Sequence, residues 1–77
     1  MSPRLPTLRG EAVLRALKKA GFIVVRIKGS HHIMAHHDDP ARRTVVPIHS
    51  GQDIKRGLLR KIIDDAGLSI DEFIGLI

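Results

Sequence analysis

The sequence predicts an α+β fold in which a helix, three antiparallel strands and two further helices follow one another along 77 residues. Two observations predict this order. Apolar residues near both ends of the chain recur with the period of a helix, whereas those in the middle alternate with the two-residue period of a strand. Between two alternating stretches, the pair Gly29-Ser30 is typical of a hairpin turn. Connections this short favour a three-stranded antiparallel sheet with the helices on one face.

The first helix is expected between Thr7 and Gly21. Its apolar stripe consists of Val13, Ala16, Leu17 and Ala20. Thr7 is the expected N-cap, because its hydroxyl can accept a hydrogen bond from a free N–H of the first turn. Gly21 is expected to end the helix, since helices commonly end at a glycine with a left-handed backbone.

Three strands are expected in the middle of the chain, at Phe22–Lys28, from His31 to about His36, and from about Arg43 to Ile48. In the first strand, alternation places Ile23, Val25 and Ile27 on one face and Val24, Arg26 and Lys28 on the other. The wholly apolar face is expected to be the buried one. Pro47 cannot donate to a ladder, so the third strand is expected to end there or to lie at an edge.

The second long helix is expected before Gly67, with an apolar stripe formed by Leu58, Leu59, Ile62 and Ile63. After it, Ser69 and Glu72 have the spacing of a capping box. The capping box predicts a short extra helix at the C-terminal end of the chain, with Phe73 on its apolar side.

Composition and charge limit the classes of function. A chain of this length is expected to form a single domain over residues 1–77, with residues 1–6 flexible and one modest core. It contains no cysteine, which excludes disulfides and thiolate metal sites. The formal net charge of +5 favours an anionic partner such as nucleic acid, although a basic and inert surface has the same composition. The only aromatic residues are Phe22 and Phe73, too few for the base-stacking platforms of single-strand binders.

Neither a membrane span nor a signal peptide is expected from the sequence. No apolar run approaches the roughly 20 residues of a membrane span, and the first residues lack the apolar segment of a signal peptide. A cytoplasmic protein without a membrane partner is therefore expected.

The hairpin sets the orientation of two histidines. If Gly29 and Ser30 form a two-residue loop, Lys28 pairs with His31 and Ile27 pairs with His32. On this register His31 shares a face with two cations, and His32 leans toward the core. A three-residue loop would reverse the parity and expose His32 instead.

The same register pairs Arg26 with Ile33 and Val25 with Met34, so Arg26 joins Lys28 on the face of His31. Histidine can take and give protons near neutral pH. A solvent-facing histidine beside two cations therefore points to proton transfer on a phosphate, whereas a surface histidine with no role is the alternative.

The other polar clusters are weaker candidates. His36, His37 and Asp38 have metal-ligand side chains, but adjacent residues of a strand point to opposite faces, so no metal and no cofactor are expected. His49 follows the third strand, and the sequence does not fix whether it approaches the hairpin. The cations of the second long helix are interpreted as a solvated face, with phosphate contact as the alternative. These cations are Lys55, Arg56, Arg60 and Lys61.

Several short stretches, taken in order and spacing, identify a family resemblance. They are Ala20-Gly21-Phe22, Lys28-Gly29-Ser30-His31-His32, Val45-Val46-Pro47-Ile48-His49, Lys55-Arg56-Gly57-Leu58-Leu59-Arg60-Lys61-Ile62 and Ala66-Gly67-Leu68-Ser69. From about Thr7 onward, the chain resembles the HicA toxins of bacterial HicA–HicB toxin–antitoxin modules, also called the YcfA-like family. The resemblance implies a fold like that of double-stranded-RNA-binding domains, and a small metal-independent ribonuclease that cleaves mRNA.

The resemblance also implies site residues and partners. The family's catalytic histidine follows the Gly-Ser turn and corresponds to His31, or to His32 in the members that use the next position. The Lys-Pro-Gly that usually precedes the second long helix reads Lys55-Arg56-Gly57 here. The implied partners are mRNA and a HicB-like antitoxin protein.

The leading hypothesis is therefore an endoribonuclease toxin in which His31 acts as general base, or as base and acid together. The expected RNA-binding residues are Arg26, Lys28, Gly29 and Ser30. The sequence offers no obvious second acid group. A non-catalytic RNA-binding module, and an antitoxin-binding subunit of a repressor complex, are the alternatives.

Overall fold

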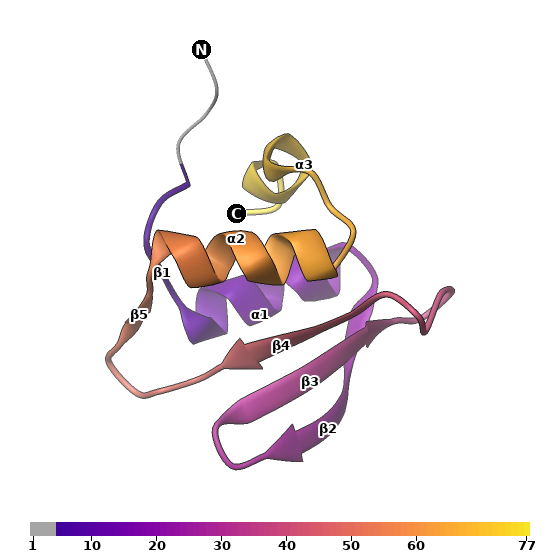
Figure 1. Ribbon diagram of the computed structural model, residues 1–77, viewed down its shortest axis with the longest axis horizontal. Coiled ribbons are helices and arrows are strands. Elements are labelled where there is room, and N and C mark those ends of the chain that lie inside the picture. The colour runs from indigo at the N-terminus through magenta and orange to yellow at the C-terminus, as the bar shows by residue number, and fades with distance from the viewer. Residues whose placement is uncertain (1–4) are drawn as a thin grey trace.

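The computed structural model describes residues 5–77 and has the expected α+β architecture (Figure 1). In chain order the elements are β1 (Leu8–Arg9), α1 (Gly10–Lys19), β2 (Phe22–Lys28), β3 (His31–His36), β4 (Arg43–Pro47), β5 (Asp53–Ile54), α2 (Arg56–Asp65) and α3 (Ile70–Ile74). Strands β2, β3 and β4 form a three-stranded antiparallel sheet in that order. The predicted sheet and the short C-terminal helix are confirmed.

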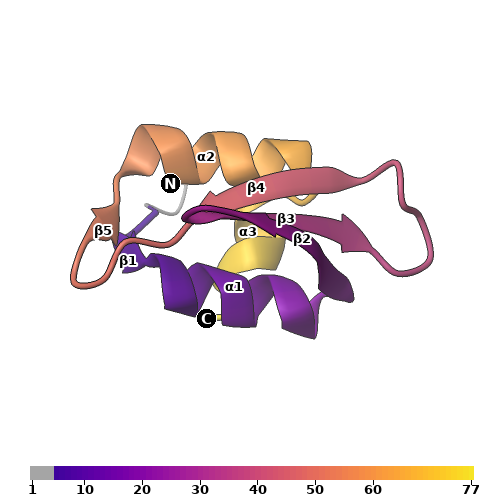
Figure 2. The same cartoon turned by 90° about the horizontal axis from the view of Figure 1, so that it is seen from below.

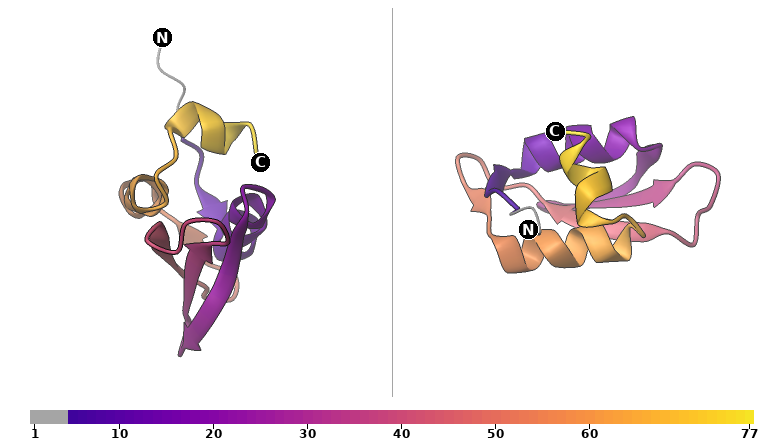
Figure 3. Two further views of the ribbon diagram at one scale, coloured as in Figure 1. Left: turned by 90° about the vertical axis from the view of Figure 1, so that its right-hand side faces the viewer. Right: turned by 90° about the horizontal axis from the view of Figure 1, so that it is seen from above.

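The elements form three layers. Helices α1 and α2 run alongside each other, with the sheet on one side of them and α3 on the other (Figures 1 and 2). Seen from above, α3 crosses over both long helices (Figure 3). No helix within residues 5–77 has the length and apolar character needed to cross a membrane.

One hydrophobic cluster joins all three layers. Its largest fully buried members are Phe22, Phe73, Leu17, Met34, Leu59, Ile62, Ile63, Val13 and Val46. The buried hydroxyl of Thr44 donates to the backbone oxygen of Ile62 at 2.9 Å, which ties β4 to α2. Leu5 also belongs to this cluster. The sequence predicts that residues 1–6 are flexible. Of these, residues 1–4 lie outside the described residues.

The burial predicted for β2 is wrong. Ile23, Val25 and Ile27 are exposed, whereas Phe22 is buried and Val24 is half-buried. A β-bulge between Val24 and Arg26 explains the exposure of Ile23: the extra residue leaves Val24, not Val25, opposite Met34. Ile27 remains on the side of His32 and Met34, and it is exposed at the turn end of the strand. Because a bulge reverses the side-chain alternation, Val24 and Arg26 lie on opposite faces rather than on the predicted common face.

The beginning of the chain also differs from expectation. Leu8 and Arg9 are extended and pair with Ile54 and Asp53, forming a small two-stranded sheet that the sequence pattern did not reveal. Helix α1 therefore begins at Gly10 with Arg9 as its N-cap, and no side chain caps it. The prediction of Thr7 as N-cap is wrong because the extended residues of β1 separate it from the helix.

Two predicted helix signals are confirmed. Gly21 follows α1 with a φ of 98°, in the left-handed region that favours glycine. At α3, Ser69 Oγ accepts from the backbone N–H of Glu72, and the Glu72 carboxylate accepts from the backbone N–H of Ser69, both at 3.0 Å. The second of these bonds is the main reason why the pKa of Glu72 lies below its ordinary value.

Candidate functional site

The turn of the β2–β3 hairpin has the two-residue loop that the sequence predicts. Gly29 has a φ of 59°, which suits the first central position of a tight hairpin turn. Lys28 pairs with His31, and Ile27 pairs with His32. The bulge lies farther along the strand, so it leaves the register at this end unchanged.

This register places His31, Lys28 and Arg26 on one face of the sheet, which we call the outer face. All three are exposed. His32 points to the opposite face, where it is half-buried and its Nδ1 lies 3.3 Å from the backbone oxygen of Ser30. Of the two histidines after the turn, His31 is thus the one whose ring is available to a ligand on the outer face.

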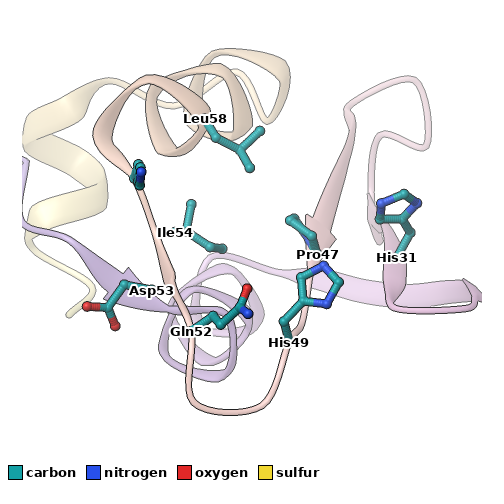
Figure 4. A pocket seen from close by; sticks show the side chains of 8 residues that line it. His31, Pro47, His49, Gln52, Asp53, Ile54 and Leu58 are labelled. Carbon is teal, nitrogen blue, oxygen red and sulfur yellow. The ribbon is translucent and has the colours of Figure 1, made fainter.

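His31 borders a hollow of about 420 Å³ between the turn end of the sheet and the loop that leads into α2 (Figure 4). Pro47, His49, Lys55 and Leu58 also line this hollow. A neighbouring hollow of about 290 Å³ lies between His31 and the side of α2. His31 therefore lies where two surface depressions meet.

The structure brings His49 to the same hollow as His31, a point that the sequence left open. The backbone N–H of Ile48 donates to the backbone oxygen of Ser30 at 2.8 Å. The residues that precede His49 and His31 are therefore joined directly. Beside this bond, His49 Nε2 lies 3.5 Å from Ser30 Oγ.

The cations near α2 separate into two groups. Lys55 lines the hollow of His31 and His49, and Lys61 lines the neighbouring one, where it pairs with Asp65 at 3.1 Å. Arg56 and Arg60 instead line a different depression beside Leu5. The sequence could not make this division, because it depends on how the start of α2 meets the sheet.

At the other end of β3, His36, His37 and Asp38 have ligand atoms within 4.8 Å of one another. The expectation that these residues point to opposite faces is wrong, because β3 ends at His36 and the two imidazole rings stack with centroids 4.9 Å apart. Both nitrogens of His36 are nevertheless engaged. Nδ1 accepts from the backbone N–H of Asp38, and Nε2 lies within hydrogen-bond distance of the backbone oxygen of Ala20, each at 3.1 Å. His36 therefore has no free lone pair for a metal, and this cluster fastens the end of β3 to the end of α1.

Fold and site together define a small α+β protein that presents two histidines and several cations at an open end of its sheet. The family model described as the HicA toxin of bacterial toxin–antitoxin matches residues 10–68. The chain belongs to the HicA toxin family, and is therefore the toxin of a toxin–antitoxin module. No curated protein matches the chain. The match confirms the resemblance seen in the sequence, and it includes the hairpin, both hollows and α2.

Proposed function

We propose that this toxin is a metal-independent endoribonuclease that cleaves mRNA and is inhibited by a HicB-like antitoxin. The observation that carries the proposal is the position of His31: it is exposed, it borders two hollows, and it lies directly opposite Lys28. A proton-transfer group beside a cation suits a reaction at a phosphodiester.

RNA supplies its own nucleophile, so this small site has little chemistry to provide. His31 takes the proton of the 2′-hydroxyl as the 2′-oxygen attacks phosphorus, a contribution worth roughly 10²–10⁴-fold in rate. Lys28 and Arg26, on the same face, bind the phosphate and stabilise its developing charge. A Cβ at Gly29 would meet no atom within 4 Å, so the backbone of the turn is open to a ligand.

The choice of His31 over His32 rests on exposure. His31 faces the hollows, whereas His32 is half-buried and its Nδ1 lies close to the backbone oxygen of Ser30. A general base must come within hydrogen-bond reach of the proton that it removes. His31 meets this requirement for a ligand on the outer face, and His32 faces away from it.

The antitoxin is proposed to cover the outer face. Beside the cations, this face exposes the apolar side chains of Ile23 and Val45. A standard interface buries about 800 Å² on each partner, a large share of one face of a molecule with 4909 Å² of accessible surface. An acidic partner with an apolar centre would complement this combination of charge and exposed side chains.

Cleavage in the presence of a chelator tests the proposed activity. Purified protein is expected to cut single-stranded RNA in EDTA and to leave a 2′,3′-cyclic phosphate or its hydrolysis product. The His31→Ala protein, purified in the same way, controls for contaminating nuclease. Binding of RNA without cleavage would instead indicate a binding module, and strict dependence on an added divalent metal would exclude the mechanism.

A further inference from the structure

We propose that His49 is a second catalytic residue, which donates a proton to the leaving 5′-oxygen while His31 acts as the base. This inference rests on the proposed ribonuclease function and deepens it. The proposed reaction involves two proton transfers, one from the 2′-hydroxyl and one to the departing 5′-oxygen. With His31 alone, one ring has to perform both.

Backbone geometry limits the distance between the two histidines. His31 is the cross-strand partner of Pro47, and paired Cα atoms in antiparallel strands lie about 4.5–5.5 Å apart. His49 follows two residues later, at most about 7 Å farther along the chain. The 2.8 Å hydrogen bond from Ile48 N–H to the Ser30 oxygen holds this segment against the turn. One phosphodiester is therefore within reach of both rings.

The surroundings of His49 favour a chemical role over a structural one. Its side chain is exposed, and the hydrogen bond that it makes within residues 5–77, to Ser30 Oγ, is long at 3.5 Å. A contact of this kind contributes little to stability. His49 nevertheless lines the hollow that His31 borders, and in the close-up its ring lies beside Pro47, the cross-strand partner of His31 (Figure 4). Lys55 lines the same hollow and supplies a positive charge for a phosphate oxygen.

The proposed step balances as follows. Neutral His31 accepts the proton of the 2′-hydroxyl as the bond between the 2′-oxygen and phosphorus forms. Protonated His49 gives its proton to the 5′-oxygen as the bond between phosphorus and that oxygen breaks. The products are a 2′,3′-cyclic phosphate and a 5′-hydroxyl, with His31 protonated and His49 neutral. Exchange with water restores both rings, and neither an oxidant nor a metal takes part.

A substrate with a better leaving group isolates the contribution of His49. In RNA with a bridging sulfur at the 5′ position of the cleaved linkage, the departing thiolate needs no proton. His49→Ala is expected to cleave ordinary RNA at least about 10²-fold more slowly than the wild type, and to recover nearly the full rate on the sulfur substrate. His31→Ala is expected to stay slow on both, because the 2′-hydroxyl still needs a base.

Two further variants serve as controls. His37→Ala removes an exposed histidine at the opposite end of β3 and is expected to leave both rates unchanged. His49→Gln keeps a polar side chain of similar length without a titratable proton, and it is expected to reproduce the pattern of His49→Ala. Thermal melts of all variants show whether they remain folded.

The outcomes separate the inference from the function on which it rests. If the wild type cleaves RNA and both His49 variants match it, the inference is wrong and the ribonuclease proposal stands. Equal slowing of the His49 variants on both substrates would mean that His49 binds or positions RNA, which also overturns the inference. If the folded wild type cleaves neither substrate, the proposed function fails and the inference falls with it.

Discussion

The two ends of β2 lie in different surroundings. Next to α1, Phe22 is buried with 1 % of its surface exposed, whereas toward the turn Val25 and Ile27 are 44 % and 59 % exposed. Figure 1 shows the reason: the strand starts beside the helices, and the turn reaches beyond them. The β-bulge lies between the two parts.

Within this one short sheet, the part that stabilises the fold therefore differs from the part that is proposed to carry out the chemistry. The end under the helices contributes Phe22 and Met34 to the core. The turn end contributes Lys28 and His31, whose side chains are exposed. We therefore expect substitutions at the turn end to change activity more than stability, and substitutions under the helices to do the opposite.

The largest expected effect is at the turn end. His31→Ala is predicted to reduce RNA cleavage by roughly 10²–10⁴-fold and to abolish toxicity, with an unchanged melting temperature, because the exposed ring contributes little packing. His32→Ala is the matched control: it is expected to lose less activity and more stability, since His32 is half-buried. Cleavage assays and thermal melts of both variants check the prediction. The reverse ranking would identify His32 as the catalytic histidine and His31 as the structural one.

Substitutions in the core are expected to have the opposite effect, a large loss of stability. Phe73 of α3 is fully buried, and Phe73→Ala is predicted to lower the free energy of unfolding by about 3–5 kcal/mol. Ile27→Ala removes an apolar side chain that is 59 % exposed, and a surface change of this kind is expected to stay within about 0.5 kcal/mol. Urea titrations of both variants provide the measurement. Similar losses would mean that the turn end also supports the core.

A smaller effect is expected from the cations of the outer face. RNA binding should weaken with salt, since each contact with a single-strand phosphate contributes a slope of about −0.7 to log K against log salt concentration. Lys28→Ala is predicted to make the slope shallower by about that amount. Lys18→Ala removes an exposed lysine of α1 and serves as its matched control. Filter binding across a salt series measures both slopes. Equal changes in the slopes of the two variants would indicate that RNA binds elsewhere on the protein.

The same contrast explains what the sequence could predict. The register of His31 and Lys28 followed from the turn, because a two-residue loop sets the pairing of the nearest residues. The buried face of β2 could not be predicted from the sequence, because both faces of the strand carry apolar side chains. A bulge then reversed the alternation at Val25. No local pattern showed the bulge, which depends on how β2 pairs with β3 and meets α1.

The candidate site was predictable in part for similar reasons. His31 comes from one hairpin, so its position depends on local rules. His49 and Lys55 reach the same hollow only through the hydrogen bond between Ile48 and Ser30 and through the β1–β5 pair that precedes α2. Both are contacts between residues far apart in the sequence. The stretch Pro47-Ile48-His49 contributes to the family resemblance, but it does not show which part of the molecule His49 approaches.

The smallest predicted effect concerns the capping box of α3, far from the turn. The backbone N–H of Ser69 holds the pKa of Glu72 below its ordinary value of 4.5. Because the folded-state pKa is the lower one, this stabilisation is present at neutral pH and is lost as the pH falls through the folded-state value. Glu72→Gln is therefore predicted to flatten the acid side of the stability profile, measured as melting temperature between about pH 6 and about pH 3.

Ser69→Ala removes the hydroxyl but keeps the N–H that bonds to Glu72, so it should lower stability at neutral pH by about 1 kcal/mol and retain much of the acid dependence. Neither substitution is expected to change RNA cleavage, since α3 lies on the opposite side of the long helices from the sheet (Figure 1). A loss of activity in a folded Glu72→Gln protein would show that the two ends of the molecule are coupled.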